Sequence, residues 1–111
     1  MGEDEVLLVY VTAATADEAK RIGRTLVEER LAACVNVLAP HTAIYRWQGR
    51  LEESAESAFL AKTTRARLAA LAARVRALSS YTLPAILALP AVGGDAEFLA
   101  WVKVETADPV A

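Results

Sequence analysis

Apolar residues along the chain recur with two different periods, and the change between them marks the predicted elements. Val6–Thr12 (VLLVYVT) is β-branched, aromatic and almost free of polar side chains, which is typical of a strand paired on both edges. From about residue 16 to residue 33, apolar residues instead recur every three or four positions, which predicts an amphipathic helix. Thr15 and Glu18 have the spacing of a capping box at the start of this helix. A central strand followed by a capped helix therefore opens the fold.

The middle of the chain predicts a second strand and a long hairpin. Cys34–Leu38 is typical of a strand, and a bend or bulge is expected at Pro40 because proline cannot donate a ladder hydrogen bond. Between residues 43 and 64, two extended runs flank the pair Gln48–Gly49. Gly49 can supply the positive φ that a tight hairpin turn needs, so this segment is expected to form a long β-hairpin.

A second helix, a further apolar strand and a short helix complete the pattern. Residues 65–80 carry one apolar stripe at helical spacing, and Pro84 prevents the helix from continuing. Ile86–Leu89 is typical of a short apolar strand. Asp95 stands where an N-cap would begin a short C-terminal helix, and the tail from Thr106 is expected to be frayed.

The order of these elements, βαββαβ followed by a short helix, specifies a fold class. It predicts the α+β ferredoxin-like arrangement, in which both main helices cover one face of an antiparallel sheet and a long hairpin joins the second and third strands. We expect one domain over residues 1–111, with an ordered core from about residue 6 to residue 104. The chain has no further layer for the other face of the sheet. Other copies of the chain are therefore expected to cover it, as a homo-oligomer.

Composition favours self-association and argues against a membrane segment and against nucleic-acid binding. Of the 111 residues, 55% are hydrophobic, and the mean hydropathy of +0.29 indicates more apolar surface than a domain of this size can easily bury. Apolar runs fall far short of the roughly 20 residues that cross a bilayer, so no membrane segment is expected. With 12 basic and 14 acidic residues, the chain lacks the excess of positive charge that nucleic-acid binding needs. The acidic start of the sequence does not resemble a secretory signal and predicts a cytoplasmic protein.

Candidate catalytic and metal-binding residues are few and scattered. The single histidine, His41, is expected on a surface loop, without a neighbouring nucleophile or acid in the sequence. The single cysteine, Cys34, is expected to be a small buried hydrophobic residue rather than a reactive thiol. A metal site assembled between subunits from these residues and Glu52, Glu53 and Glu56 is an alternative, although a solvated hairpin arm also explains the acids. The sequence thus predicts a protein that is not an enzyme.

Several segments together resemble the CutA1 family of divalent-cation tolerance proteins. LAACVN, IYRWQG, LAKTT and YTLPAILALP occur in the order and spacing of that family, and the likeness extends from Val6 to Val102. The resemblance implies a ferredoxin-like subunit, a tight homotrimer and an association with tolerance of copper and other divalent metals. It also implies that four residues lie in segments that build subunit contacts: Tyr45, Trp47, Gly49 and Trp101.

The same resemblance identifies metal donors that this chain lacks. Family members commonly carry a His and a Glu where this chain has Ser79 and Ala85, and some carry a Cys near the position of Val11. A serine hydroxyl is a poor ligand for Cu²⁺ or Zn²⁺, and alanine offers none. We therefore expect a divalent cation such as Cu²⁺ to bind weakly, with no other cofactor, and leave the physiological ligand and further protein partners open.

A small-ligand sensor is the alternative function. PII signalling proteins share the trimeric ferredoxin-like plan and bind nucleotides in clefts between subunits, although a shared fold is weak support for a shared function. Lys62 and Tyr81 are the candidates for lining such a cleft, while packing in the core or at its rim is the simpler explanation for both.

Overall fold

The computed structural model describes residues 2–108, which form an elongated body with extents of 45 × 27 × 23 Å. Its elements along the chain are β1 (Val6–Ala13), α1 (Ala16–Glu28), β2 (Cys34–Val37), β3 (His41–Trp47), β4 (Arg50–Thr64), α2 (Arg65–Leu78), β5 (Ile86–Pro90) and α3 (Ala96–Glu105).

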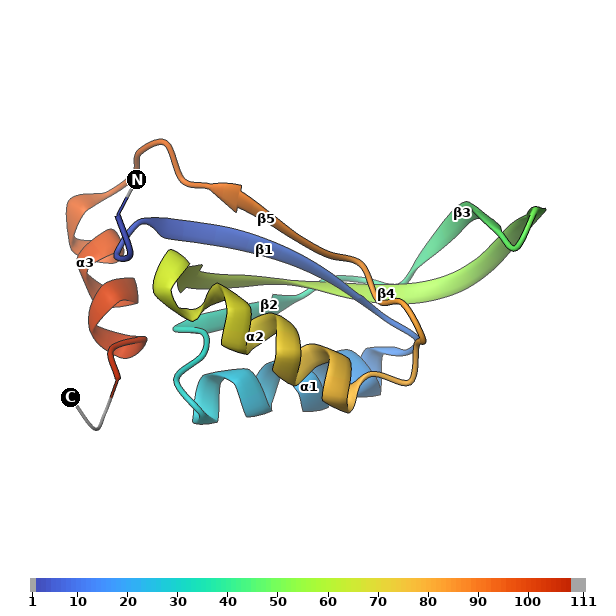
Figure 1. Cartoon of the computed structure of the whole chain (residues 1–111), viewed down its shortest axis with the longest axis horizontal. Coiled ribbons are helices and arrows are strands. Elements are labelled where there is room, and N and C mark those ends of the chain that lie inside the picture. The colour runs from blue at the N-terminus through green and yellow to red at the C-terminus, as the bar shows by residue number, and fades with distance from the viewer. Residues whose placement is uncertain (1, 109–111) are drawn as a thin grey trace.

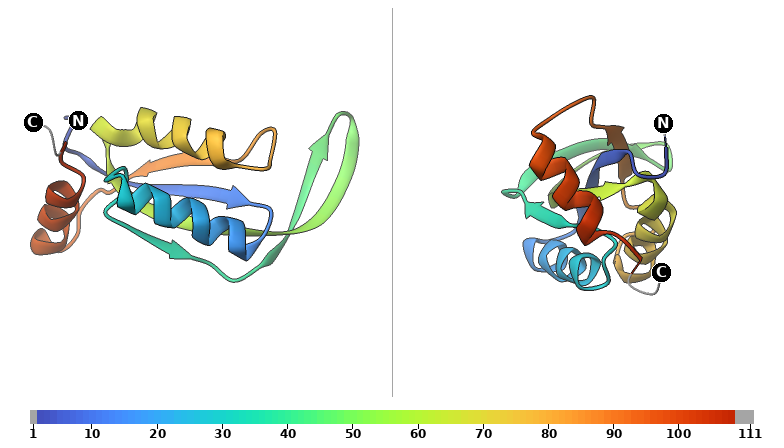
Figure 2. Two further views of the ribbon diagram at one scale, coloured as in Figure 1. Left: turned by 90° about the horizontal axis from the view of Figure 1, so that it is seen from below. Right: turned by 90° about the vertical axis from the view of Figure 1, so that its left-hand side faces the viewer.

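The strands form one antiparallel sheet in the order β2-β4-β1-β5, and β3 pairs with the N-terminal half of β4. Helices α1 and α2 lie side by side on one face of this sheet (Figure 1; Figure 2). The predicted ferredoxin-like fold is confirmed. β2 and β3 are separate strands because the chain breaks at Leu38–Pro40, as expected for a proline that cannot donate to the ladder.

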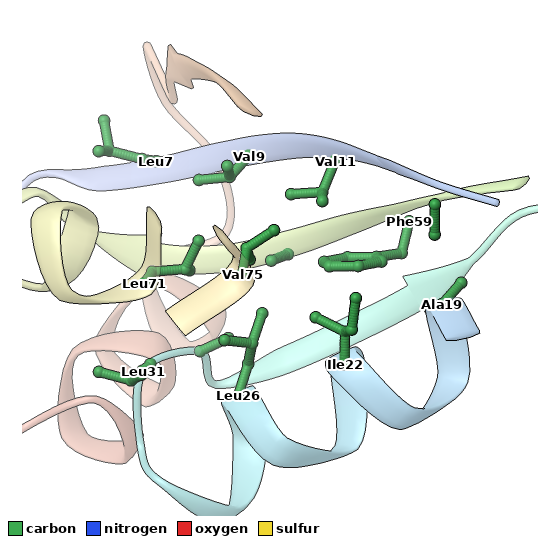
Figure 3. Packing of buried hydrophobic residues seen from close by; sticks show 13 residues of the cluster. Leu7, Val9, Val11, Ala19, Ile22, Leu26, Leu31, Phe59, Leu71 and Val75 are labelled. Carbon is green, nitrogen blue, oxygen red and sulfur yellow. The ribbon is translucent and has the colours of Figure 1, made fainter. Parts of the chain in front are cut away.

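The core lies between the sheet and the two covering helices (Figure 3). Alternate residues of β1 point toward the helices because strand side chains alternate between faces. The buried side chains come from both layers and include Leu7, Val9 and Val11 of β1, Phe59 of β4, Ile22 and Leu26 of α1, and Leu71 and Val75 of α2. Burying one such side chain contributes roughly 1.5–3 kcal/mol. The apolar stripes read from the sequence are therefore the core.

The first helix ends at Glu28 rather than near residue 33, which corrects the predicted boundary. Arg30 adopts a left-handed conformation with φ 59°, and the N–H of Leu31 donates to the carbonyl oxygen of Leu26 at 2.8 Å. This is the Schellman pattern of helix termination, with an arginine where glycine is usual. The apolar run that follows continues the helical period in the sequence, but it is buried as irregular backbone and leads directly into β2.

The opposite face of the sheet is covered by neither α1 nor α2 (Figure 2). Leu8 and Tyr10 of β1 point to this face because they alternate with core residues, and β5 places Leu87 and Leu89 beside them. Leu87 is 60% exposed and Leu89 is 51% exposed. An apolar sheet face thus remains in contact with solvent in the single chain.

The hairpin and the C-terminal helix form as their sequence signals indicate. Gln48 and Gly49 have φ values of 51° and 81°, which are typical of a two-residue type I′ turn. The carboxylate of Asp95 accepts a hydrogen bond from the N–H of Phe98 at 2.9 Å, as an N-cap should. Thr106 is buried and bonded to the carbonyl oxygen of Val102, so the predicted fraying does not begin there. Residues 109–111 lie outside the described part of the chain.

No helix within residues 2–108 combines the length and the apolar character needed to cross a membrane.

Candidate functional site

A cleft of about 530 Å³ lies between the β3–β4 hairpin and the loop that joins α2 to β5. Its volume is within the roughly 300–1,000 Å³ typical of small-molecule sites. Along β3, alternation places Ala43, Tyr45 and Trp47 on one face of the strand. The cleft is lined by Thr12, Ala43, Tyr45, Arg46, Trp47, Glu56, Ser80, Tyr81, Thr82, Leu83 and Ala85.

Glu56 is the central polar residue of this cleft. One carboxylate oxygen, Oε2, lies 3.1 Å from Nε2 of His41, and the other, Oε1, accepts a hydrogen bond of 3.3 Å from the hydroxyl of Tyr81. The Glu56 side chain is only 12% exposed. The expectation of a partnerless loop histidine was therefore wrong, because His41 is the first residue of β3 and lies opposite Glu56 in the strand register.

Glu18 holds the loop on the other side of the cleft in place. Its carboxylate accepts hydrogen bonds of 3.0 Å each from the backbone N–H groups of Ala14 and Ser80. Burial opposes its ionisation, but these donors, together with the Ser80 side chain and a smaller effect of Arg21, lower the pKa of Glu18 below its ordinary value. Thr15 caps the helix as predicted, through the N–H of Glu18, whereas the Glu18 carboxylate reaches Ala14 and the distant α2–β5 loop.

Two further contacts fix the same loop against β1. Thr12 and Ala85 exchange hydrogen bonds: the Thr12 N–H donates to the Ala85 carbonyl at 3.1 Å, and the Ala85 N–H donates to Thr12 Oγ1 at 2.9 Å. The hydroxyl of Ser79 accepts from the N–H of Tyr81 at 3.0 Å. The cleft wall is therefore held by specific hydrogen bonds at both ends of the loop.

The surroundings of Tyr81 in the cleft raise the pKa of its phenol. Burial is the largest effect, and the negative charge of Glu56 and its hydrogen bond add to it, so that the pKa of Tyr81 rises to about 12. Tyr45 and Glu18 contribute in the same direction. The phenol is therefore un-ionised at neutral pH, and this neutral hydroxyl is the form that donates to Glu56.

The four residues predicted to build subunit contacts lie in three parts of the structure. Tyr45 and Trp47 line the cleft beside Tyr81. Gly49 forms the hairpin turn, and Trp101 lies on α3 with its ring 5.7 Å from that of Phe98. Their contact with other subunits stays a prediction.

Lys62 stands apart from the cleft of the single chain. It pairs with Leu8 and Cys34 in the sheet register, six residues along β4 from Glu56, or about 20 Å at strand spacing. A role for Lys62 in a cleft between subunits stays a prediction.

The positions that correspond to metal donors in the resemblance serve structural roles here. Val11 is fully buried in the core, Ser79 is the C-cap of α2, and Ala85 bonds to Thr12 through its backbone. Within residues 2–108, no group of three or more His, Cys, Asp or Glu side chains is arranged to hold a metal ion. Cys34 is partly exposed rather than buried, which corrects the expectation for its side chain.

Sequence reasoning missed the roles of Glu18 and Glu56. Glu56 was grouped with the solvated acids of the hairpin, yet counting pairs outward from the Gln48–Gly49 turn would have placed it opposite His41. No comparable signal exists for Glu18 and Ser80, which are 62 positions apart in the chain. Their contact depends on how α1 and the α2–β5 loop meet in space.

The fold and the cleft define a small α+β ferredoxin-like protein with a candidate ligand site beside its hairpin. Comparison with known proteins makes the assignment more specific. Residues 7–105 match the family model described as CutA1 divalent ion tolerance protein. The chain belongs to the CutA1 family.

Individual relatives show how close the similarity is. The divalent-cation tolerance protein CutA of Thermus thermophilus is 46% identical over 99 residues, which cover 89% of this chain and 96% of that protein. Human protein CutA is 39% identical over 91% of this chain, which spans 56% of the human protein. The solved structure of Cut A1 from Thermus thermophilus superposes with a TM-score of 0.89 at 44% identity, covering 92% of this chain and 99% of that one. The CutA1 structure from Oryza sativa gives a TM-score of 0.90 at 35% identity, with 94% and 95% covered.

Proposed function

We propose that this protein is a homotrimer that contributes to tolerance of divalent metal ions, copper in particular, without catalysing a reaction. Membership of a family named for divalent ion tolerance supports the metal part of this proposal. The exposed apolar face of the sheet supports self-association, because large apolar patches on a small domain mark interfaces. This uncovered face is the observation on which the assembly rests.

Native mass spectrometry tests the assembly. We expect a trimer of the 11.9 kDa chain, and a Leu89→Glu variant should dissociate because it puts a charge on the open sheet face. Val27→Glu is the matched control, since Val27 is also apolar and exposed but lies on α1. A monomeric wild-type protein, or equal dissociation of both variants, would refute the interface.

Direct binding of metal should be weak. Ser79 and Ala85 provide no strong ligand, and both oxygens of Glu56 already accept hydrogen bonds. Calorimetric titration of the apo protein with Cu²⁺ should show no stoichiometric site of sub-micromolar affinity. Such a site, abolished by a substitution of His41 or Tyr81, would contradict this part of the proposal.

A small-ligand sensor is a second candidate function, and the cleft favours it. The cleft has the size of a ligand site, and two hydrogen-bonded contacts to β1 and α1 hold its loop. A thermal-shift screen with nucleotides and metabolites tests it, because a specific ligand raises the melting temperature by mass action. The absence of any shift would remove this candidate.

A further inference from the structure

We propose that the cleft binds a small quaternary ammonium ion, with Glu56 as its counter-charge and the rings of Tyr45, Trp47 and Tyr81 around it. This inference rests on the second candidate function, a small ligand held in the cleft, and assigns the chemical class of that ligand.

The balance of charge around the cleft favours a cation. The side chain of Glu56 is largely buried, and Glu18 is only 5% exposed behind Ser80. Within residues 2–108, neither carboxylate forms an ion pair with lysine or arginine, and the partner of Glu56 is His41. Largely buried carboxylates without a permanent cation attract one, because charge in a low-dielectric site is poorly screened.

Among the residues that the structure describes, Arg46 is the one lysine or arginine that lines the cleft. It alternates with Tyr45 and Trp47 along β3, so its side chain lies on the other face of the strand. Burial is the largest cause of the raised pKa of Tyr81, about 12, and the charge of Glu56 adds to it, so Glu56 acts on the cleft as a negative charge.

The walls of the cleft favour a methylated ammonium group over other cations. In the single chain, Tyr45 and Trp47 are 41% and 40% exposed, and both line the cleft together with Tyr81. Aromatic faces attract quaternary ammonium ions through their ring quadrupoles, and tryptophan does so most strongly. Both oxygens of Glu56 already accept hydrogen bonds, from His41 and Tyr81, so a cation without N–H donors suits this carboxylate.

Two other ligand classes fit less well. A transition metal needs several His, Cys or carboxylate ligands. Glu56 and His41 are the candidates at the cleft, and Nε2 of His41 and Oε2 of Glu56 already share a hydrogen bond. A nucleotide or other anion would meet the negative charges of Glu56 and Glu18, and the residues that line the cleft include no glycine of a phosphate-binding loop.

Paired ligands that differ only in charge test the proposal on the intact assembled protein. Choline and 3,3-dimethylbutan-1-ol have nearly the same shape, but only choline is charged. Calorimetry at neutral pH should show choline binding at least about tenfold tighter than the neutral alcohol, which is the scale of a cation–π contact with a counter-charge. Equal binding of the two, no choline binding at millimolar concentration, or tighter binding of ethanolamine than of choline would overturn the proposal.

Substitutions distinguish choline binding in the cleft from binding through surface charge elsewhere. Glu56→Gln and Trp47→Leu should each weaken choline binding by about tenfold, because each removes one source of attraction for the cation. Glu53→Gln is the matched control, since Glu53 is an exposed acid of the same strand on the opposite face. Equal loss in Glu53→Gln would show that surface charge alone is responsible and would overturn the site.

The outcomes also separate this inference from the functions proposed above. Stabilisation by nucleotides but not by choline would refute the ligand class and leave a small-ligand function standing. If neither nucleotides nor choline stabilised the protein, both the ligand class and the small-ligand function would be refuted. Native mass spectrometry decides the trimer independently of these results.

Discussion

Replacing Glu18 by glutamine should destabilise the protein through the loss of one buried acceptor. The carboxylate of Glu18 now accepts from the N–H groups of Ala14 and Ser80, at 3.0 Å each. A glutamine has one acceptor oxygen, so it can satisfy one N–H and must turn its own NH₂ group toward the other. A hydrogen bond to a charged group contributes about 1.5–3 kcal/mol, and a buried donor left unpaired costs about 1–3 kcal/mol. We therefore expect a loss of about 2 kcal/mol.

The effect should depend on pH in a definite direction. Burial alone would raise the pKa of Glu18, but its donors outweigh burial and hold the pKa below the ordinary value of 4.5. The stability that the carboxylate contributes is thus complete above pH 4.5 and is lost as the pH falls through the lower folded-state pKa. The difference between wild type and Glu18→Gln should be largest at neutral pH and should shrink below pH 4.5.

Urea unfolding at a fixed protein concentration, followed by circular dichroism at neutral and at acidic pH, measures this difference. Glu28→Gln is the control, because Glu28 is an exposed acid of the same helix and should change stability by less than about 0.5 kcal/mol. If Glu18→Gln matched this control at neutral pH, or if its effect grew as the pH fell, the assigned role of Glu18 would be wrong.

Two further substitutions test the hairpin and the cleft. Gly49→Ala should lower the free energy of unfolding by about 1 kcal/mol because φ is 81° there. Gly93→Ala is the control and should be nearly neutral, since Gly93 has open space around it and no positive φ. Equal effects of the two variants in urea unfolding would contradict the turn assignment. In an alkaline absorbance titration, Tyr81 should ionise near pH 12, assigned by comparison with Tyr81→Phe. Glu56→Gln should move that pKa toward 10 without reaching it, since burial, the larger effect, remains; an unchanged pKa would show that Glu56 does not act on the phenol.

Local signals in the sequence were sufficient for the elements of the fold. The continuous apolar run of β1 and the stripe through Ile22 and Leu26 follow from strand and helix periodicity, and the structure buries both as predicted. The turn at Gly49 and the N-cap at Asp95 depend on the backbone chemistry of one or two residues, so their sequence positions were enough to locate them. The helix end at Arg30 was missed because a non-glycine residue occupies the left-handed position.

The cleft, by contrast, depends on segments that are distant in the chain. His41, Glu56 and Tyr81 come from two strands and a loop, and no periodicity links Tyr81 to the other two. Glu18 has the local spacing of a capping residue, yet its carboxylate bonds to Ser80 because α1 and the α2–β5 loop meet at one end of the sheet.

The sequence by itself determined which residues are apolar, the order and approximate positions of the helices and strands, and which family the chain resembles, because these properties depend on near neighbours and on composition. Only the tertiary structure decided which carboxylates are buried and which hydroxyls and N–H groups they bind. Burial, hydrogen bonding and charge at a site are set by atoms brought together from different segments, and that arrangement exists only once the chain has folded.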